Sequence, residues 1–209
     1  MRIRSIKIQG YKSIKEQTVS LNQINILIGG NGIGKSNFVS AFELLRAISN
    51  QQLQRYVIEN GGADSLLHFG KRTTDSIIIE TELENGEYKN RYTVKLKESQ
   101  DKIYVSEAST SILSDGNWHT QICAKDKEEI GESALPKFEI YHFHDTSAKS
   151  PIKGYKSIND NSFLRSDGSN IAPYLYYIKL RHPKHYELIE KTISTVTPSF
   201  KSFCLEPNR

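Results

Sequence analysis

The fold is decided by the stretch Gly29-Gly30-Asn31-Gly32-Ile33-Gly34-Lys35-Ser36, which sets four glycines before a lysine and a serine. The residues before it, Asn25 to Ile28, are mostly apolar and predict a short buried strand. After it, apolar residues recur at the spacing of one helix face and predict a helix to about Ser49: Phe38, Ala41, Phe42, Leu45 and Ile48. The sequence therefore predicts a strand, a glycine-rich loop and an amphipathic helix, in that order.

The loop matches the phosphate-binding pattern G-x-x-x-x-G-K-[ST], the P-loop, at every position. Glycines let the backbone approach a polyphosphate closely, and N–H groups converge at the positive end of the following helix. Lys35 is expected to reach the β- and γ-phosphate oxygens, and the Ser36 hydroxyl to ligate Mg²⁺. A glycine-rich turn beside a chance Lys-Ser pair is the alternative, but strand, spacing and helix all favour a nucleotide site. No Asn-Lys-x-Asp guanine-reading motif is present, so ATP with Mg²⁺ is the expected ligand.

Length and composition bound the class of protein. The chain has 209 residues, 37% of them hydrophobic and 25% charged, which suits one large α/β domain or two small lobes. No run of about 18 apolar residues predicts a membrane span. The net charge of +4 allows a nucleic-acid partner without requiring one. Two cysteines without a C-x-x-C pair predict neither a disulfide framework nor a zinc site, and the alternating N-terminus is unlike a signal peptide, so we expect a cytoplasmic protein.

The rest of the chain alternates between strand and helix patterns. Short strands are predicted at Arg2–Gln9 and Thr18–Leu21. An antiparallel meander follows the first helix, with turns expected at Asn85-Gly86 (type I′), Gln100-Asp101 and Asp115-Gly116. Further along lie a charged linker at 124–136, a strand at 138–143, and two helices, one from about Ser169 and one from Pro183.

The predicted fold is therefore an α/β P-loop NTPase with an inserted antiparallel β lobe and C-terminal helices. We expect three segments: a P-loop strand–helix core at 1–70, the β lobe with its linker at 71–145, and a loop and helical segment at 146–209.

Two stretches resemble the SMC and RecF branch of ABC-type ATPases. The loop from Gly30 to Asn37 resembles that family's G-x-N-G-x-G-K-S-N sequence, and Ile6 to Ile14 resembles its first strand and turn. In that family the basic residue and serine after the aromatic lie near the nucleotide. The resemblance thus adds Lys12, Ser13 and Asn37 to the predicted loop contacts, and the full set is Lys12, Ser13, Gly29, Gly30, Asn31, Gly32, Ile33, Gly34, Lys35, Ser36 and Asn37.

Three later stretches are similar to bacterial ATPases related to the OLD and Septu-type defence systems. They are Gly61–Gly70, Tyr141–Ser147 and Ser166–Ala172. This resemblance implies a role in DNA repair or phage defence, with a homodimer that sandwiches ATP and with DNA or an effector protein as a possible partner. No chemical role for these stretches follows from their residues.

Catalytic elements of such ATPases are missing from the sequence. Ile77-Ile78-Ile79-Glu80 lacks the aspartate of a Walker B strand. Leu164-Arg165-Ser166-Asp167-Gly168 departs from the L-S-x-G signature at Arg165, and Ser166 or Asp167 is better interpreted as a helix cap. The catalytic residues are thus unknown. We expect the N-terminal part of an ATPase head, which binds ATP and hydrolyses it only with a missing C-terminal half.

Weaker candidates remain beside the loop. His142, His144 and Asp145 could hold a metal, although polar residues at a strand end are the commoner explanation. A row of basic residues on one strand is either a solvated face or a track for a phosphate backbone: Lys89, Arg91, Lys95 and Lys97. A nucleic-acid-binding or interaction scaffold with a structural nucleotide site is therefore the alternative function.

Overall fold

The computed structural model describes residues 2–127, 139–141, 143, 147 and 149–207. The chain divides into two compact units, residues 1–138 and residues 139–209.

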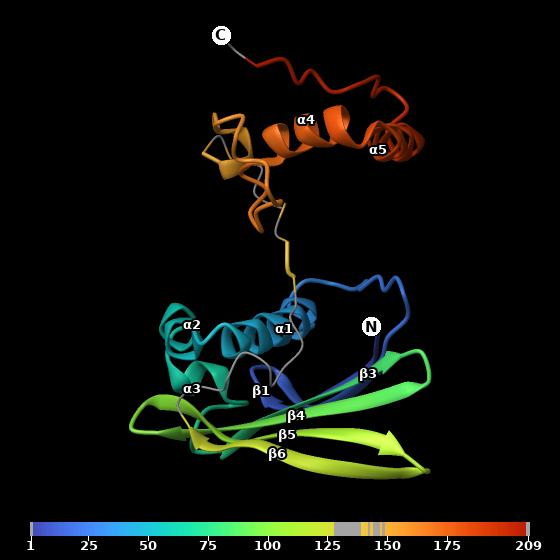
Figure 1. The fold of residues 1–209 in the computed structure, drawn as a ribbon. Coiled ribbons are helices and arrows are strands. Elements are labelled where there is room, and N and C mark those ends of the chain that lie inside the picture. Colours follow the sequence, from blue (N-terminus) through green and yellow to red (C-terminus); the bar gives the residue numbers. More distant parts are fainter. Residues whose placement is uncertain (1, 128–138, 142, 144–146, 148, 208–209) are drawn as a thin grey trace. The chain divides into compact units, whose positions relative to one another are not determined.

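A six-stranded antiparallel sheet forms the base of the first unit (Figure 1). Its strand order is β2-β1-β3-β4-β5-β6. The strands are β1 (Arg2–Tyr11), β2 (Ile14–Ser20), β3 (Ser76–Asn85), β4 (Tyr88–Ser99), β5 (Lys102–Ser114) and β6 (Asn117–Lys127). The first strand pairs with β2 on one side and with β3 on the other, so the meander and the first hairpin belong to one sheet.

Three helices cover one face of this sheet: α1 (Lys35–Ser49), α2 (Leu53–Glu59) and α3 (Ala63–Leu66) (Figure 1). Alternate residues of the strands point toward the helices, as a sheet with one covered face requires. The shared core is fully buried and includes Ile6, Ile8, Leu44, Leu45, Ile48, Ile77, Ile79, Val94 and Leu96. One hydrophobic core therefore joins the P-loop helix to the meander. The three-segment division at 70 and 145 stays a prediction.

The predicted helix after the glycine-rich loop is confirmed as α1, and the antiparallel meander is confirmed as β3 to β6. The first meander turn differs by one residue from the prediction. Asn85 pairs with Tyr88, so Gly86 and Glu87 form the turn, and of these only Gly86 has a positive φ, 63°. That pattern is typical of a type II′ turn, in which only the first central residue is left-handed.

The predicted strand at 25–28 is wrong. These residues have no strand assignment, and Ile24, Ile26 and Ile28 are 82%, 78% and 86% exposed. A continuous apolar run is typical of a strand buried on both faces, which needs paired neighbours. None of the strands in the described residues pairs with this run, although β2 and β6 are the edges of the sheet.

The second unit contains a short 3-10 turn, η1 (Pro151–Lys153), and two helices, α4 (Ile171–Arg181) and α5 (Pro183–Val196). Both helices match the prediction. The predicted strand at 138–143 lies partly outside the described residues, and its described members, 139–141 and 143, are not in a strand.

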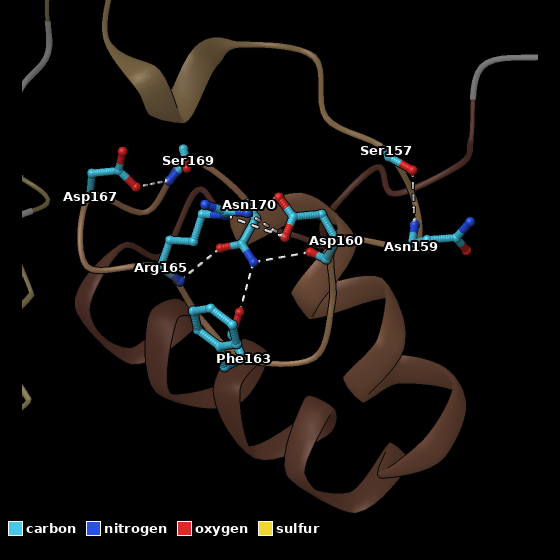
Figure 2. A network of polar contacts seen from close by, with 8 residues as sticks. All are labelled: Ser157, Asn159, Asp160, Phe163, Arg165, Asp167, Ser169 and Asn170. Carbon is cyan, nitrogen blue, oxygen red and sulfur yellow. Dashed lines mark hydrogen bonds and ion pairs between the residues drawn. The ribbon is translucent and has the colours of Figure 1, made fainter.

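A polar network organises the loop before α4 (Figure 2). The fully buried Asn170 donates through Nδ2 to the carbonyls of Asp160 (3.0 Å) and Phe163 (2.7 Å), and its Oδ1 accepts from the Arg165 N–H (2.8 Å). The Arg165 side chain also forms an ion pair with Asp160 at 3.0 Å. These contacts hold the loop closed upon itself.

The predicted helix cap at Ser166 or Asp167 is wrong. The helix begins at Ile171, after Asn170, and the Asp167 carboxylate instead accepts from the Ser169 N–H at 2.9 Å. That hydrogen bond lowers the pKa of Asp167. Asn170 is the residue before the helix, and its side chain bonds the backbone of the preceding loop and not the helix N-terminus.

Candidate nucleotide-binding site

The glycine-rich loop is open and depends on glycine for its backbone shape. Gly32 and Gly34 have φ values of 82° and 97°, in the left-handed region that side chains disfavour. A Cβ added at Gly32 would meet nothing within 4 Å, so the backbone angle and not crowding requires glycine there. The Ile33 side chain, by contrast, folds back onto Gly29, and this exposed side chain would have to move to admit a Cβ there. The loop residues Asn31 and Ile33 are exposed.

The loop leads directly into the N-terminus of α1, with Gly34 as the residue before the helix. Within the described part of the chain no side chain caps this end, and the first turn of the helix holds no acidic residue. The positive end of a 15-residue helix therefore faces the loop without a fixed negative partner. These features fit an anion such as a phosphate group.

The two side chains expected to contact ligand lie at this end. Lys35 folds back over the loop, and its Nζ donates to the carbonyls of Gly29 (2.7 Å) and Gly30 (2.6 Å). Ser36 is exposed in the first turn of α1. Its role as a Mg²⁺ ligand stays a prediction.

The turn between β1 and β2 also lies at the N-terminus of α1. The Ser13 Oγ accepts from the Asn37 Nδ2 at 2.7 Å, and a Cβ added at Gly34 would lie 3.1 Å from that Oγ. The structure thus brings Ser13 together with the end of the loop and the first turn of α1. These residues are far apart in the sequence.

Lys12 lies beside Ser13 and is held by a different part of the chain. Its Nζ donates to the Asn60 Oδ1 at 3.0 Å, and its carbonyl lies 2.8 Å from the His68 Nδ1. Partial burial lowers the pKa of the Lys12 ammonium, and the nearby charge of Glu43 partly offsets this effect. The structure thus places the Lys12 ammonium on Asn60 and over the Tyr11 ring, and its contact with nucleotide stays a prediction.

The sequence did not single out Asn60 or His68. Both lie in or next to the stretch Gly61–Gly70, which carries a family resemblance but no motif of known chemistry. One sequence feature could have indicated His68: it directly follows two leucines, Leu66 and Leu67. A histidine buried in such an apolar run needs a hydrogen-bond partner for its ring.

The weaker candidates add no second site among the residues that the structure describes. His142, His144 and Asp145 lie outside the described residues, and no group of three metal-ligating side chains occurs among the residues the structure describes. Arg91, from the basic row, forms ion pairs with Glu82 (2.6 Å) and Glu80 (3.4 Å) of the neighbouring strand, so that face of the sheet carries both charges. No helix in the described ranges is both long enough and apolar enough to span a membrane.

Comparison with known proteins agrees with this geometry. A model of the AAA ATPase domain family matches residues 1–197. The chain belongs to that family. Over 102 residues, 47% of the chain, it is 34% identical to "Structural maintenance of chromosomes protein 3" of Arabidopsis thaliana, and the match spans 8% of that protein.

These similarities support an ATP-binding P-loop ATPase module of SMC-like type. The finer relationship to OLD and Septu-type ATPases stays a prediction. Because the match spans so little of the curated relative, the activity and partners of that whole protein do not transfer to this AAA ATPase domain.

Proposed function

We propose that this AAA ATPase domain binds ATP with Mg²⁺ at residues 29–36 and is the nucleotide-binding part of an ABC/RecF-like head. The observation that carries the proposal is the α1 N-terminus, which has no side-chain cap and no acidic residue, and which faces a loop with the complete P-loop pattern. A purely structural turn would gain stability from a capping side chain at this position.

Each residue has a distinct task in this proposal. Backbone N–H groups of the loop and the first turn of α1 would bind the phosphate oxygens. The Lys35 ammonium would exchange the carbonyls of Gly29 and Gly30 for the outer phosphates. The Ser36 hydroxyl would hold Mg²⁺, which neutralises charge between the phosphates when bound.

Hydrolysis needs more than this binding site. A water must be oriented, and the charge on the γ-phosphate must be stabilised. We propose that a carboxylate and a signature loop from a further segment, in a homodimer that sandwiches ATP, supply these functions. A role in DNA repair or phage defence, with DNA or an effector protein as partner, is the biological setting that the resemblances favour.

The exposed run from Ile24 to Ile28 supports an incomplete head. Four large apolar residues lie before the loop, and three of them are more than three-quarters exposed. A segment that pairs with this run would convert it to the buried strand that its sequence favours.

The alternative, a nucleic-acid scaffold, is less supported because Arg91 in the basic row is paired with glutamates.

Equilibrium binding of labelled ATP with Mg²⁺ tests the proposal. Lys35→Ala should weaken binding about ten- to a hundredfold, since it removes a charge-assisted phosphate contact of about 1.5–3 kcal/mol. Lys15→Ala is the matched control, because Lys15 is an exposed lysine on β2. Equal affinity of Lys35→Ala and the native chain would overturn the proposal, and a lowered Tm of Lys35→Ala without ligand would show that the lysine is structural.

A further inference from the structure

The turn that carries Ser13 to the P-loop has an unusual backbone. Lys12 has a φ of 47°, which is uncommon for a residue with a side chain. Such a conformation persists only where surrounding contacts enforce it. The contacts of Lys12 therefore indicate what holds Ser13 against Gly34 and Asn37.

The first set of contacts is made by the backbone. Leu67 forms an isolated antiparallel bridge with Tyr11 at the end of β1. On either side of it the Lys12 N–H donates to the Leu66 carbonyl (2.8 Å), and the His68 N–H donates to the Gly10 carbonyl (3.0 Å). Residues 66–68 thus act as a short extra strand against the last residues of β1.

The second contact is made by the His68 side chain. The His68 residue is only 8% exposed, and its Nδ1 lies 2.8 Å from the Lys12 carbonyl oxygen. A carbonyl oxygen can only accept, so the ring must carry its proton on Nδ1. The ring also packs against Phe69, with 4.4 Å between the ring centroids, so its position is fixed from two sides.

We propose that His68 is a positioning residue of the nucleotide site. It donates to the Lys12 carbonyl, keeps the turn in its left-handed conformation and so places Ser13 beside Gly34 and Asn37. The inference rests on the proposed function, because it assigns His68 to the support of the ATP site. His68 itself touches no ligand in this role.

Two substitutions separate the hydrogen bond from the shape of the ring. His68→Phe keeps a ring for packing against Phe69 but leaves the Lys12 carbonyl without its donor. His68→Asn gives up the ring but places an amide nitrogen near the position of Nδ1. We expect His68→Phe to weaken ATP·Mg²⁺ binding about five- to tenfold, which corresponds to the loss of one buried hydrogen bond, and His68→Asn to bind within about twofold of the native chain.

Backbone NMR reports the local structure of the turn and the loop separately from the global stability of the protein. His68→Phe should shift the amide signals of Ser13 and Gly34 without ligand, and His68→Asn should restore them. Leu83→Ala is the control for general destabilisation, since Leu83 is a 3% exposed core residue of β3 that lies between Ile3 and Asn90 of the neighbouring strands. It should lower the Tm and leave ATP affinity unchanged.

The outcomes are distinguishable. Native affinity in His68→Phe, while Lys35→Ala loses binding, overturns the role of His68 and leaves the proposed function intact. Native affinity in both variants overturns the proposed function itself. Equal losses in His68→Phe and His68→Asn, with unshifted Ser13 and Gly34 signals, overturn the positioning role, because the restored donor then restores neither binding nor the turn. If His68→Phe does not fold, His68→Leu takes its place.

Discussion

At the scale of single residues, three hydroxyl groups form a cluster between β1 and the first two helices. The Tyr11 hydroxyl lies 2.8 Å from the Tyr56 hydroxyl and 3.0 Å from the Ser40 Oγ, and Tyr11 is fully buried. Burial raises the pKa of Tyr11 far above its usual range and also raises that of Tyr56. The cluster joins the strand that carries the Lys12–Ser13 turn to the P-loop helix.

Tyr11→Phe tests the energetic role of this cluster. We expect it to lower the free energy of unfolding by about 1–2 kcal/mol at neutral pH, because two buried hydroxyls lose a partner. Above about pH 10 the unfolded native chain loses the Tyr11 proton that the folded chain keeps, so the stability contributed by this group falls as pH rises. Urea unfolding at about pH 7 and about pH 11 should therefore show a smaller difference between native and variant at the higher pH. A constant difference would contradict the raised pKa.

At the scale of elements, the sequence predicted those parts whose pattern is local. The helix from the P-loop to Ser49 and the meander could be predicted because their apolar residues repeat over many positions. The prediction of a strand at 25–28 was wrong because a strand forms only when another strand pairs with it. No local sequence pattern encodes the presence of a pairing partner. The contact of His68 with Lys12 was missed because 56 residues separate the two partners. The P-loop residues themselves were predictable because their chemistry lies in one short motif.

The Gly86 turn tests whether the sheet and the helix layer unfold together. Gly86→Ala should cost about 1 kcal/mol, since the φ of 63° is unfavourable for alanine and a Cβ there meets nothing within 4 Å. Glu87→Ala, in the same turn but without a positive φ, should have little effect. Because one core joins α1 to the meander, the unfolding transitions of the α1 backbone amide signals in NMR spectra and of Trp118 fluorescence should shift together. A shift of the Trp118 signal alone would show that the meander is an independent lobe.

At the scale of the whole molecule, the chain carries a site for binding and lacks identified groups for catalysis. The purified 209-residue chain should bind ATP weakly and hydrolyse it at the background rate, because neither a water-orienting carboxylate nor a signature loop was found in its sequence. Phosphate release measured with and without Lys35→Ala checks this. Robust turnover that disappears in the Lys35→Ala variant would mean that an acidic residue of this chain completes the site, with Asp145 as the first candidate.

The exposed run from Ile24 to Ile28 has a consequence for the abundance of the protein in the cell. Short extended apolar segments are sites of aggregation and of recognition by chaperones and proteases. If a further segment pairs with this run, as proposed above, a chain synthesised in the cell without that segment would be a target for degradation. The amount of the covering segment would then set the abundance of the ATPase as well as its activity, and unassembled chains would be removed by quality control.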